Sequence, residues 1–422
     1  MSHCAGQRRA PAPAHTYNVD ATAGSDTATG HEDAPLKTIA AANALTFKPG
    51  DRVLLKRGET WAGTRITIGY SGKPGRPIVY GAYGAGALPI INAAGANDAI
   101  FADGKSYVSV FGIQGQGADN AATGYGVRLQ GGCSYITLDG VKIASALREG
   151  IFIDACSYIT VADCEATAAF VGLQFWGASH HCTVSGGSYY SNDEEGANAE
   201  DGSHHIEFIG VTAHDNVKAG FDVADATTTD LMYRRCAAYA NGDDGFSIYT
   251  GGSRTRYENC LAYNNSAHGI EVQAGAAGDG IEIEHCTSAG NAYRNYNIQV
   301  GTTLLFRNNI GRQCGYNEQL KIFAGVTYTA DYNCYWREGG VTKNVLGATT
   351  YDTLANWQTA TSQEAHSLFS DPVLVNPAIW DLHLQTTSPC KDAGVDAGVA
   401  ADYDSVARDV TPAIGAYEYV AA

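Results

Sequence analysis

A parallel β-helix is the fold class that this sequence predicts, and three columns of regularly spaced residues predict it. The first column is a short phrase that begins about every 24 residues between Gly126 and Lys321. Each phrase has apolar residues at its second and fourth positions, as in Gly220-Phe-Asp-Val and Gly269-Ile-Glu-Val. Alternation of this kind is a strand pattern, and its return at a steady interval is typical of a coil that adds one turn per repeat.

Two further columns recur in phase with the phrases. The second, three positions after an apolar strand residue, contains Cys164, Gly187, Val211, Cys236, Cys260, Cys286 and Asn309. The third consists of asparagines, namely Asn192, Asn216, Asn241, Asn265 and Asn291. Asparagine tolerates the left-handed backbone of a sharp corner, and its amide can pass hydrogen bonds from coil to coil. We therefore expect an asparagine ladder along the solenoid.

Composition and charge narrow the choice of partners. The 422 residues include 50 glycines and 25 tyrosines, with only 17% charged residues, which suits short strands and tight turns. A net charge of −17 argues against a nucleic-acid groove. The same charge would repel a polyanionic ligand unless a cation bridges the ligand and the protein. No run approaches the length of a membrane span, so we expect neither a membrane nor a nucleic-acid partner.

The 11 cysteines predict a buried thiol stack rather than a disulfide scaffold. Their number is odd, and Cys236, Cys260 and Cys286 fall at one inward position of successive coils, where cysteine behaves as a small hydrophobe. An occasional disulfide between adjacent coils is the alternative, since coils lie about 4.8 Å apart. No CxxC pair is present, which argues against a zinc site.

The N-terminal part divides into a tail and a cap. Residues 1–16 form a tail with no apolar segment of the kind found in an intact secretory signal. Either a signal has been replaced here or the protein leaves the cell by another route, for instance inside a virion, and we expect an extracellular or virion-associated protein. Residues 17–52 are expected to form a cap, in which Pro35 opens a helix from Leu36 to about Leu45. This segment, with Pro49-Gly-Asp and the strand after it, resembles the N-terminal segment of secreted bacterial and phage β-helix proteins.

Residues 53–344 are expected to form the β-helix, and residues 345–422 a C-terminal cap that begins with a helix near Tyr351–Ser367. The first, less regular coils should contain the strands Thr64–Ile68, Ile78–Tyr80, Ile90–Asn92 and Tyr107–Phe111. The predicted class is therefore all-β: a right-handed parallel β-helix solenoid with an N-terminal helical cap and a C-terminal cap.

Stacked coils place the middle residue of each phrase in one outward column. That column reads Arg128, Phe152, Gln174, Asn198, Asp222, Ser247, Glu271, Asn297 and Lys321. A second column two positions on includes Trp176 and Tyr249, and the preceding turns add Lys218, Asp243, Asp244, His268 and Arg294. Carboxylates beside aromatic rings suit a sugar-binding groove, whereas a solvated acidic face is the alternative. We assign Trp176, Tyr249, Arg294 and Lys321 to substrate binding.

The phrase Asn241-Gly-Asp-Asp-Gly-Phe-Ser-Ile-Tyr, followed by Tyr257-Glu-Asn-Cys, resembles the calcium-site coil of family 9 polysaccharide lyases. That resemblance implies that Asp243 and Asp244 are calcium ligands. Asp222, one coil earlier in the stack, is the candidate for a third ligand. Hard carboxylate oxygens suit Ca²⁺, and the ion would neutralise the site and bind a uronate carboxylate. The first function that we expect is therefore cleavage of an acidic polysaccharide by calcium-assisted β-elimination.

The sequence departs from that family at two positions. Ser247 stands where the family has a further metal-binding Asp, and Glu271 stands where it has the catalytic Lys. Lys218 or His268 then becomes the candidate base, because Lys321 lies three coils from the Asp pair. Carboxylates around Lys218 would raise its pKa unless a cation occupies them.

Two other functions stay open. Asp222 and Glu271 lie two coils apart, roughly 9–10 Å, near the ~6.5–9.5 Å of an inverting glycoside hydrolase. Phage tailspike hydrolases place carboxylates on such a face, which is the second resemblance. A non-catalytic virion or surface protein, such as a fibre, decoration or adhesin subunit, is the other alternative. A homotrimer is the oligomer expected of a virion protein, although no heptad stalk is present.

Two aromatic patterns do not belong to this face. His180-His181 and His204-His205 recur 24 residues apart and predict stacked side chains at a coil corner, with a metal site as the alternative. A separate outward ladder of rings is expected at Tyr190, His214, Tyr239 and Tyr263.

Overall fold

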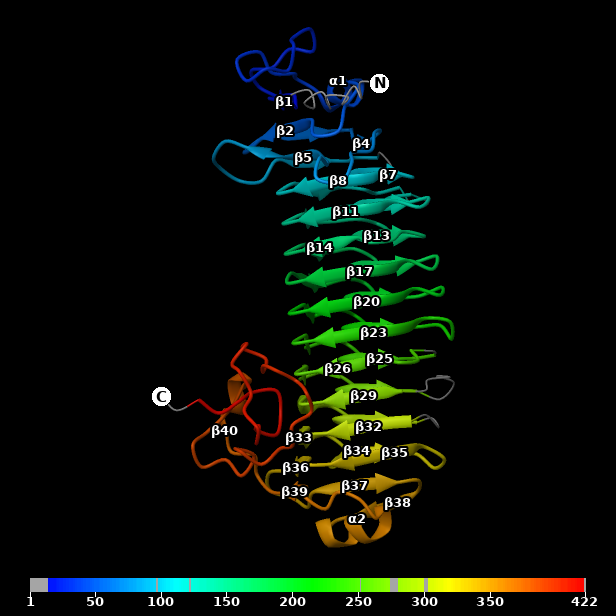
Figure 1. The fold of residues 1–422 in the computed structure, drawn as a ribbon, viewed down its shortest axis with the longest axis vertical. Helices are drawn as coiled ribbons and strands as arrows, with labels where there is room; N and C mark the ends of the chain where they lie inside the picture. Colours follow the sequence, from blue (N-terminus) through cyan, green and yellow to red (C-terminus); the bar gives the residue numbers. More distant parts are fainter. Residues whose placement is uncertain are drawn as a thin grey trace, which may run out of the picture.

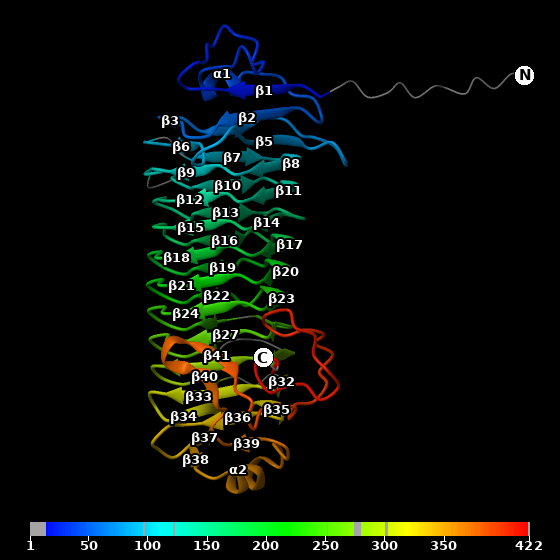
Figure 2. The ribbon, with the colours of Figure 1, turned by 90° about the vertical axis from the view of Figure 1, so that its left-hand side faces the viewer.

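The computed structural model describes residues 14–95, 98–120, 123–250, 252–273, 280–299 and 303–420, and it is a parallel β-helix. Three 13-stranded sheets run along the solenoid, whose coils stack from one end to the other (Figures 1 and 2). Successive coils contribute one strand to each sheet, and these strands pair in parallel. The exception is the last pair of sheet 2, β37 and β38, which is antiparallel. The predicted class is confirmed for the solenoid.

Sheet 1 consists of β1 (Thr16–Val19), β2 (Arg52–Lys56), β5 (Ile78–Tyr83), β8 (Ser106–Phe111), β11 (Ser134–Asp139), β14 (Thr160–Ala162), β17 (His180–Ser185), β20 (His204–Ile209), β23 (Thr229–Arg234), β26 (Arg256–Glu258), β29 (Ile281–Glu284), β32 (Thr303–Arg307) and β35 (Thr327–Asp331).

Sheet 2 consists of β4 (Ile66–Ile68), β7 (Ile100–Asp103), β10 (Val127–Gln130), β13 (Ile151–Asp154), β16 (Leu173–Trp176), β19 (Ala197–Ala199), β22 (Phe221–Val223), β25 (Phe246–Ile248), β28 (Ile270–Val272), β31 (Tyr296–Ile298), β34 (Glu318–Ile322), β37 (Lys343–Leu346) and β38 (Thr349–Tyr351).

Sheet 3 consists of β3 (Thr60–Ala62), β6 (Ile90–Asn92), β9 (Gln114–Gln116), β12 (Lys142–Ile143), β15 (Glu165–Thr167), β18 (Ser188–Tyr190), β21 (Thr212–His214), β24 (Ala237–Tyr239), β27 (Leu261–Tyr263), β30 (Thr287–Asn291), β33 (Ile310–Cys314), β36 (Cys334–Trp336) and β39 (Leu368–Phe369).

The inward residues of the three sheets fill one continuous core in which like side chains stack. The Tyr233 ring lies 5.0 Å from Phe208 and 5.1 Å from Tyr257 in stacked geometry. The Phe221 and Phe246 rings stack at 4.9 Å. The ten described cysteines are all buried and free, as the thiol-stack prediction requires.

The asparagine ladder is confirmed, and it explains why the phrases begin with glycine. Each Nδ2 donates to the Oδ1 of the next asparagine, at 2.9 Å for Asn192 to Asn216 and 3.0 Å for Asn216 to Asn241. A Cβ atom on Gly220 would lie 2.8 Å from the Nδ2 atom of Asn241 and 2.7 Å from the carbonyl oxygen of Gly245. The ladder therefore leaves no room for a side chain at that position.

The N-terminal end differs from the helical cap that the sequence predicts. The helix α1 (Ile39–Asn43) has five residues and begins after Thr38, whose side chain accepts a hydrogen bond from the Ala41 amide. The preceding chain already forms β1, which pairs with β2 and so extends sheet 1. A helical cap is thus not confirmed, because the capping threonine starts the helix three residues later than Pro35 would.

At the opposite end, α2 (Leu354–Thr361) closes the solenoid (Figure 1). Its Trp357 is fully buried. Glu364 just beyond it is also buried, and it accepts hydrogen bonds from the Tyr335 hydroxyl at 2.8 Å and the Asn333 amide at 3.0 Å. These contacts satisfy the polar groups that the last coil would otherwise expose.

Residues after 369 run back along the flank of sheet 3 (Figure 2). They contain β40 (Leu374–Asn376), a 3₁₀ turn η1 (Pro377–Ile379) and β41 (Asp381–Leu384), and their apolar side chains cover Leu261 and Ile310. Among the described residues, no helix is long and apolar enough to cross a membrane.

Candidate functional site

The outward face of sheet 2 carries the column that the repeat predicts. Asp222 on β22 pairs with Ser247 on β25, and Ser247 pairs with Glu271 on β28. The pairing continues through Asn297 to Lys321 on β34. Because parallel strands hold corresponding residues side by side, acids that are distant in sequence lie on one wall.

A pocket of about 370 Å³ opens at the middle of this wall. It is lined by Glu195, Lys218, Ala219, Asp222, Asp243, Ser247, Tyr249 and Gln273. Tyr249, which is 55% exposed, supplies an aromatic side. The pocket therefore combines carboxylates, one ammonium group and a ring, which are the groups that bind and cleave sugars.

The pocket carboxylates repel one another in a partly dry site. Burial, followed by the charge of Glu195, raises the pKa of Asp222 to about 8. Burial and the charge of Glu194 raise the pKa of Glu195, while burial and the charge of Glu271 raise the pKa of Asp243. Three ionised carboxylates are therefore unfavourable on this wall, and either protonation or a bound cation would stabilise them.

Lys218 is a cation in this pocket and not a free base. Its ammonium group forms a hydrogen-bonded ion pair with Glu194, and that contact raises the pKa of Lys218. A lysine accepts a proton only when its amine is neutral, so the geometry favours Lys218 as a binding group for an anion.

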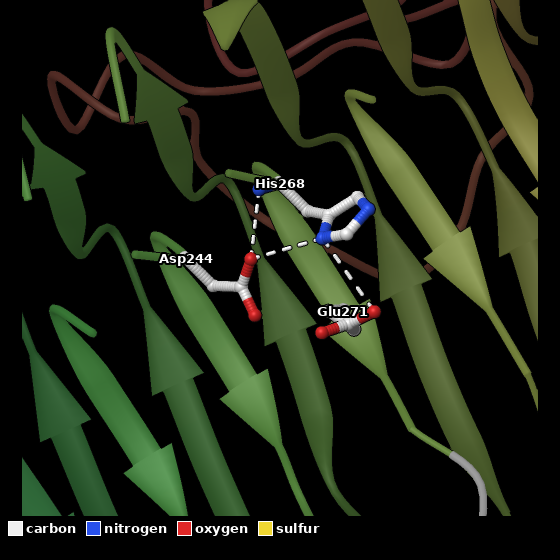
Figure 3. Close-up of side chains that lie close together, drawn as sticks. All are labelled: Asp244, His268 and Glu271. Atoms are coloured by element: carbon white, nitrogen blue, oxygen red, sulfur yellow. Dashed lines mark hydrogen bonds and ion pairs between the residues drawn. The ribbon is translucent and has the colours of Figure 1, made fainter. Parts of the chain in front are cut away.

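A second polar cluster lies directly beside the pocket and joins Asp244, His268 and Glu271 (Figure 3). The Oδ1 atom of Asp244 accepts hydrogen bonds from the His268 backbone N–H at 2.7 Å and from its Nδ1 atom at 3.0 Å. Nδ1 also lies 3.5 Å from Oε1 of Glu271. Three potential ligand atoms thus lie within 4.8 Å of one another.

Three amide side chains hold Glu271 in place. Its Oε1 atom accepts from Asn297 at 2.6 Å and from Gln299 at 2.7 Å, and its Oε2 atom accepts from Gln273 at 2.8 Å. Burial raises the pKa of Glu271, but its hydrogen bonds with Asp244 and the amides, together with the charge of His268, lower it overall. Glu271 is therefore the ionised member of the cluster.

The pKa values of the other two members of the cluster both shift toward the neutral form. Burial and the charge of Glu271 raise the pKa of Asp244 well above its ordinary value. Burial lowers the pKa of His268, and its Nε2 atom is buried with no hydrogen-bond partner among the described residues. A neutral imidazole held at Nδ1 by a carboxyl group keeps a lone pair at Nε2 that is able to accept a proton.

The predicted site residues therefore fall into three places. Asp222, Asp243, Lys218 and Tyr249 share the pocket, whereas Asp244, His268 and Glu271 form the cluster beside it. Asp244 does not line the pocket, so the three carboxylates predicted to bind calcium are not all on one surface.

The remaining predicted residues lie further along the wall. Trp176 is 37% exposed on β16, N-terminal to the pocket coils. Arg294 pairs with Glu318 at 2.6 Å, and the Lys321 ammonium lies 4.3 Å from the Phe323 ring centre. These three can contact only the flanking parts of a long ligand.

Glu195 and Gln273 also line the pocket, although neither is among the residues predicted to bind or cleave the substrate. The repeat places both on this face, because Gln273 stands in the same outward column as Tyr249 and Glu195 directly precedes a phrase.

Comparisons with known proteins agree with this architecture. The family described as "Pel9A-like, right handed beta helix region" matches residues 17–309. The crystal structure of pectate lyase Pel9A is similar over 96% of both chains, with 20% identity and a TM-score of 0.60.

Two other solved structures share the fold. The Dettilon tailspike protein gp208 matches over 71% of this chain and 62% of its own, with 13% identity and a TM-score of 0.55. The periplasmic alginate epimerase AlgG matches over 68% of this chain and 77% of its own, with 12% identity and a TM-score of 0.51. A search of the curated proteins gives no match. The family match extends over most of the solenoid, and the chain therefore belongs to the Pel9A-like right-handed β-helix family.

Proposed function

We propose that this protein cleaves an acidic polysaccharide at the sheet 2 pocket by calcium-assisted β-elimination. The observation that carries the proposal is the trio of carboxylates at Glu195, Asp222 and Asp243, whose pKa values are all raised around a single lysine. A bound divalent cation reduces the repulsion among these carboxylates, and its positive charge attracts an anionic sugar into an otherwise acidic pocket. Family membership and the likeness to a pectate lyase support the same chemistry.

The pocket side chains suit calcium because they offer hard oxygen donors. Asp222 and Asp243 would hold the ion as the sequence predicts, and Glu195 would serve as the third carboxylate in the pocket, since Asp244 faces His268. Bound there, calcium would neutralise the wall and attract the carboxylate of a uronic acid, which makes the proton on the adjacent carbon more acidic.

The protein side chains would accept the proton and bind the sugar. His268, neutral and oriented by Asp244, is the proton acceptor that we propose, and Lys218 would bind an anionic group of the sugar. Asp222, with a pKa of about 8, still holds its proton at neutral pH when no cation is bound. Tyr249 offers a ring face to the sugar in the pocket.

Flanking sugars would contact Trp176 on one side of the pocket, and Arg294 and Lys321 on the other, because all three lie along the same wall. The ligand is therefore expected to be a polymer. We place the action of the protein outside the cell or on a virion, in line with the tailspike among its structural neighbours.

Hydrolysis is the second candidate, and one observation favours it. The pKa of Asp222 is raised to about 8 while that of Glu271 is lowered, so one carboxyl group is an acid and the other a base. They stand two coils apart, roughly 9–10 Å before their side chains lean, which is close to an inverting pair.

One assay separates these functions. The protein is incubated with a panel of polyuronides and neutral glycans, with Ca²⁺ or with a chelator, while unsaturated ends and reducing ends are both measured. The lyase proposal expects unsaturated ends from a polyuronide that form only with Ca²⁺. Reducing ends without unsaturation would support hydrolysis instead, and neither product would support a structural role.

Matched variants connect the activity to the pocket. Asp222→Asn and Asp243→Asn are each expected to lower the rate of unsaturated-end formation by about 10²-fold or more. Asp193→Asn is the control, because Asp193 is exposed in a turn of the same face but does not line the pocket. Equal activity in all three variants would overturn the site assignment.

A further inference from the structure

We propose that Arg128 forms a subsite that binds a uronate carboxylate of the substrate chain, on the N-terminal part of the sheet 2 wall. Strand pairing carries the outward column from Arg128 on β10 to Asp222 on β22 in four coil-to-coil steps, roughly 19 Å at ~4.8 Å per coil. The inference rests on the proposed function, because it takes the ligand to be a polyuronide that lies along this wall.

The wall between Arg128 and the pocket is suited to hold a sugar chain lengthwise. Phe152, Gln174 and Asn198 face outward in the middle column, yet all three are buried. Phe170, in the turn before β16, and Trp176, at the end of β16, are exposed on either side of the column. A chain that lies along the column would therefore pass between two aromatic side chains.

An aromatic pair holds the guanidinium group of Arg128 in place. Its Cζ atom lies 4.9 Å from the centre of the Tyr125 ring, and that ring stacks on Phe152 at 4.9 Å. Tyr125 and Phe152 are both buried, which restricts the movement of either ring. A planar guanidinium group that already rests against a ring loses little conformational entropy when it binds a ligand.

Arg128 differs from two nearby arginines because it has no ion-pair partner. Arg65 pairs with Asp98 at 3.2 Å, and Arg148 contacts Glu149 at 3.5 Å. In the part of the chain that the structure describes, no carboxylate lies within 4.0 Å of the Arg128 guanidinium nitrogens. The positive charge of Arg128 is thus not neutralised by direct contact with an acid.

The acids closest in charge to Arg128 compete weakly for it. Burial raises the pKa of Asp98 to about 6 and also raises the pKa of Asp154, although Arg128 acts in the opposite direction on both. Each carboxyl group is shifted toward its neutral form, in which it no longer attracts a guanidinium group. A ligand carboxylate can instead accept two parallel N–H···O bonds from Arg128, which favours a uronate over a neutral sugar.

Calorimetric titration of the whole chain with uronate oligomers in Ca²⁺ tests the subsite. All proteins carry His268→Gln, so that the oligomers are not cleaved during the titration. The probes are oligogalacturonate and oligomannuronate, each as a decamer and as a trimer, since only the decamer is long enough to reach Arg128 from the pocket. Arg128→Gln is expected to weaken binding of a decamer by about 10- to 100-fold, through loss of a charge-assisted contact, and to leave trimer binding unchanged.

Two further variants keep the test specific. Arg128→Lys retains the charge without the paired donors, so its affinity for the decamer should fall between those of the parent and Arg128→Gln. The matched control Arg52→Gln removes the same charge from an exposed position on sheet 1 and should bind the decamer like the parent. Circular dichroism confirms that each variant is folded. Unchanged decamer binding in Arg128→Gln, an equal loss in Arg52→Gln, or a parent that binds neither decamer would overturn the subsite.

The subsite and the proposed reaction fail separately, because cleavage is measured in proteins that keep His268. Unsaturated ends from a polyuronide, together with unchanged decamer binding in Arg128→Gln, would overturn only the subsite. Weakened decamer binding in Arg128→Gln without any unsaturated ends would overturn only the lyase chemistry.

Discussion

At the scale of single residues, the pocket is defined by carboxyl groups that their surroundings keep from ionising freely. Asp222 is the clearest case, since burial and Glu195 raise its pKa to about 8. Glu200 follows the same logic, with its pKa raised to about 7 by burial and then by Glu195. Residues that cost stability in this way are typical of sites kept for function.

The pH dependence of stability follows from the raised pKa of Asp222. The unfolded carboxyl group ionises near pH ~3.9, while the folded one keeps its proton to about pH 8. The free energy of unfolding should therefore fall as pH rises between those values. Asp222→Asn stays neutral, so it should match the parent near pH 4 and exceed it by about 1–3 kcal/mol above pH 8.

Urea denaturation at pH 4.5 and pH 8.5 measures this difference. Added Ca²⁺ should restore stability to the parent at the higher pH and not to the variant, because only the parent has the complete carboxylate set. A parent protein with no decline over that range would show that Asp222 ionises normally.

At the scale of structural elements, ladders link one coil to the next. The asparagine ladder lies inside the corner, and on the outside Tyr239 stacks on His214 at 4.7 Å and on Tyr263 at 4.9 Å. Trp380 from the C-terminal segment ends that outer ladder at 5.1 Å from Tyr263. Each rung contacts only its two neighbours, so local damage is expected to affect the adjacent coils most.

Replacing Asn241 tests the inner ladder. Its Nδ2 atom donates to Asn265 and to the Ala213 carbonyl oxygen, and its Oδ1 atom accepts from Asn216. Asn241→Ala leaves buried polar groups without partners and should lower the free energy of unfolding by about 3 kcal/mol.

The matched control for the ladder is Asn264→Gly, one residue from the ladder position. Asn264 is exposed with a φ angle of 57°, which glycine adopts easily, so little stability should be lost. Equal midpoints for the two variants in urea would contradict a structural role for the ladder.

At the scale of the whole molecule, the C-terminal segment makes the solenoid asymmetric by covering the flank of sheet 3 and leaving the wall of sheet 2 open (Figure 2). Arg408 holds this segment in place. Its guanidinium group pairs with Glu418 at 3.1 Å and donates to Asn259 of the solenoid at 2.8 Å. Both charged side chains are nearly inaccessible to solvent, so removing either one would leave the other as an unpaired buried charge.

Arg408→Ala should therefore release the segment without unfolding the coils. The expected cost is about 3–5 kcal/mol, because a buried carboxylate loses its partner. Limited proteolysis should cut the variant after residue 369 much faster than the parent, while circular dichroism of the solenoid is retained. Arg254→Ala removes an exposed ion pair with Asp230 and should change neither readout, because solvent screens an ion pair at the surface.

The periodicity of the sequence determined which residues share a column, because one coil of a parallel solenoid has nearly constant length. The periodicity alone therefore placed Asp222 and Glu271 on one wall and predicted the ladder through Asn241. Only the tertiary structure decided that Asp243 lines the pocket while Asp244 turns to His268, since side-chain direction at a corner depends on the neighbouring coil. The path of the C-terminal segment was also beyond the sequence, because docking depends on which apolar flank the finished coils leave uncovered.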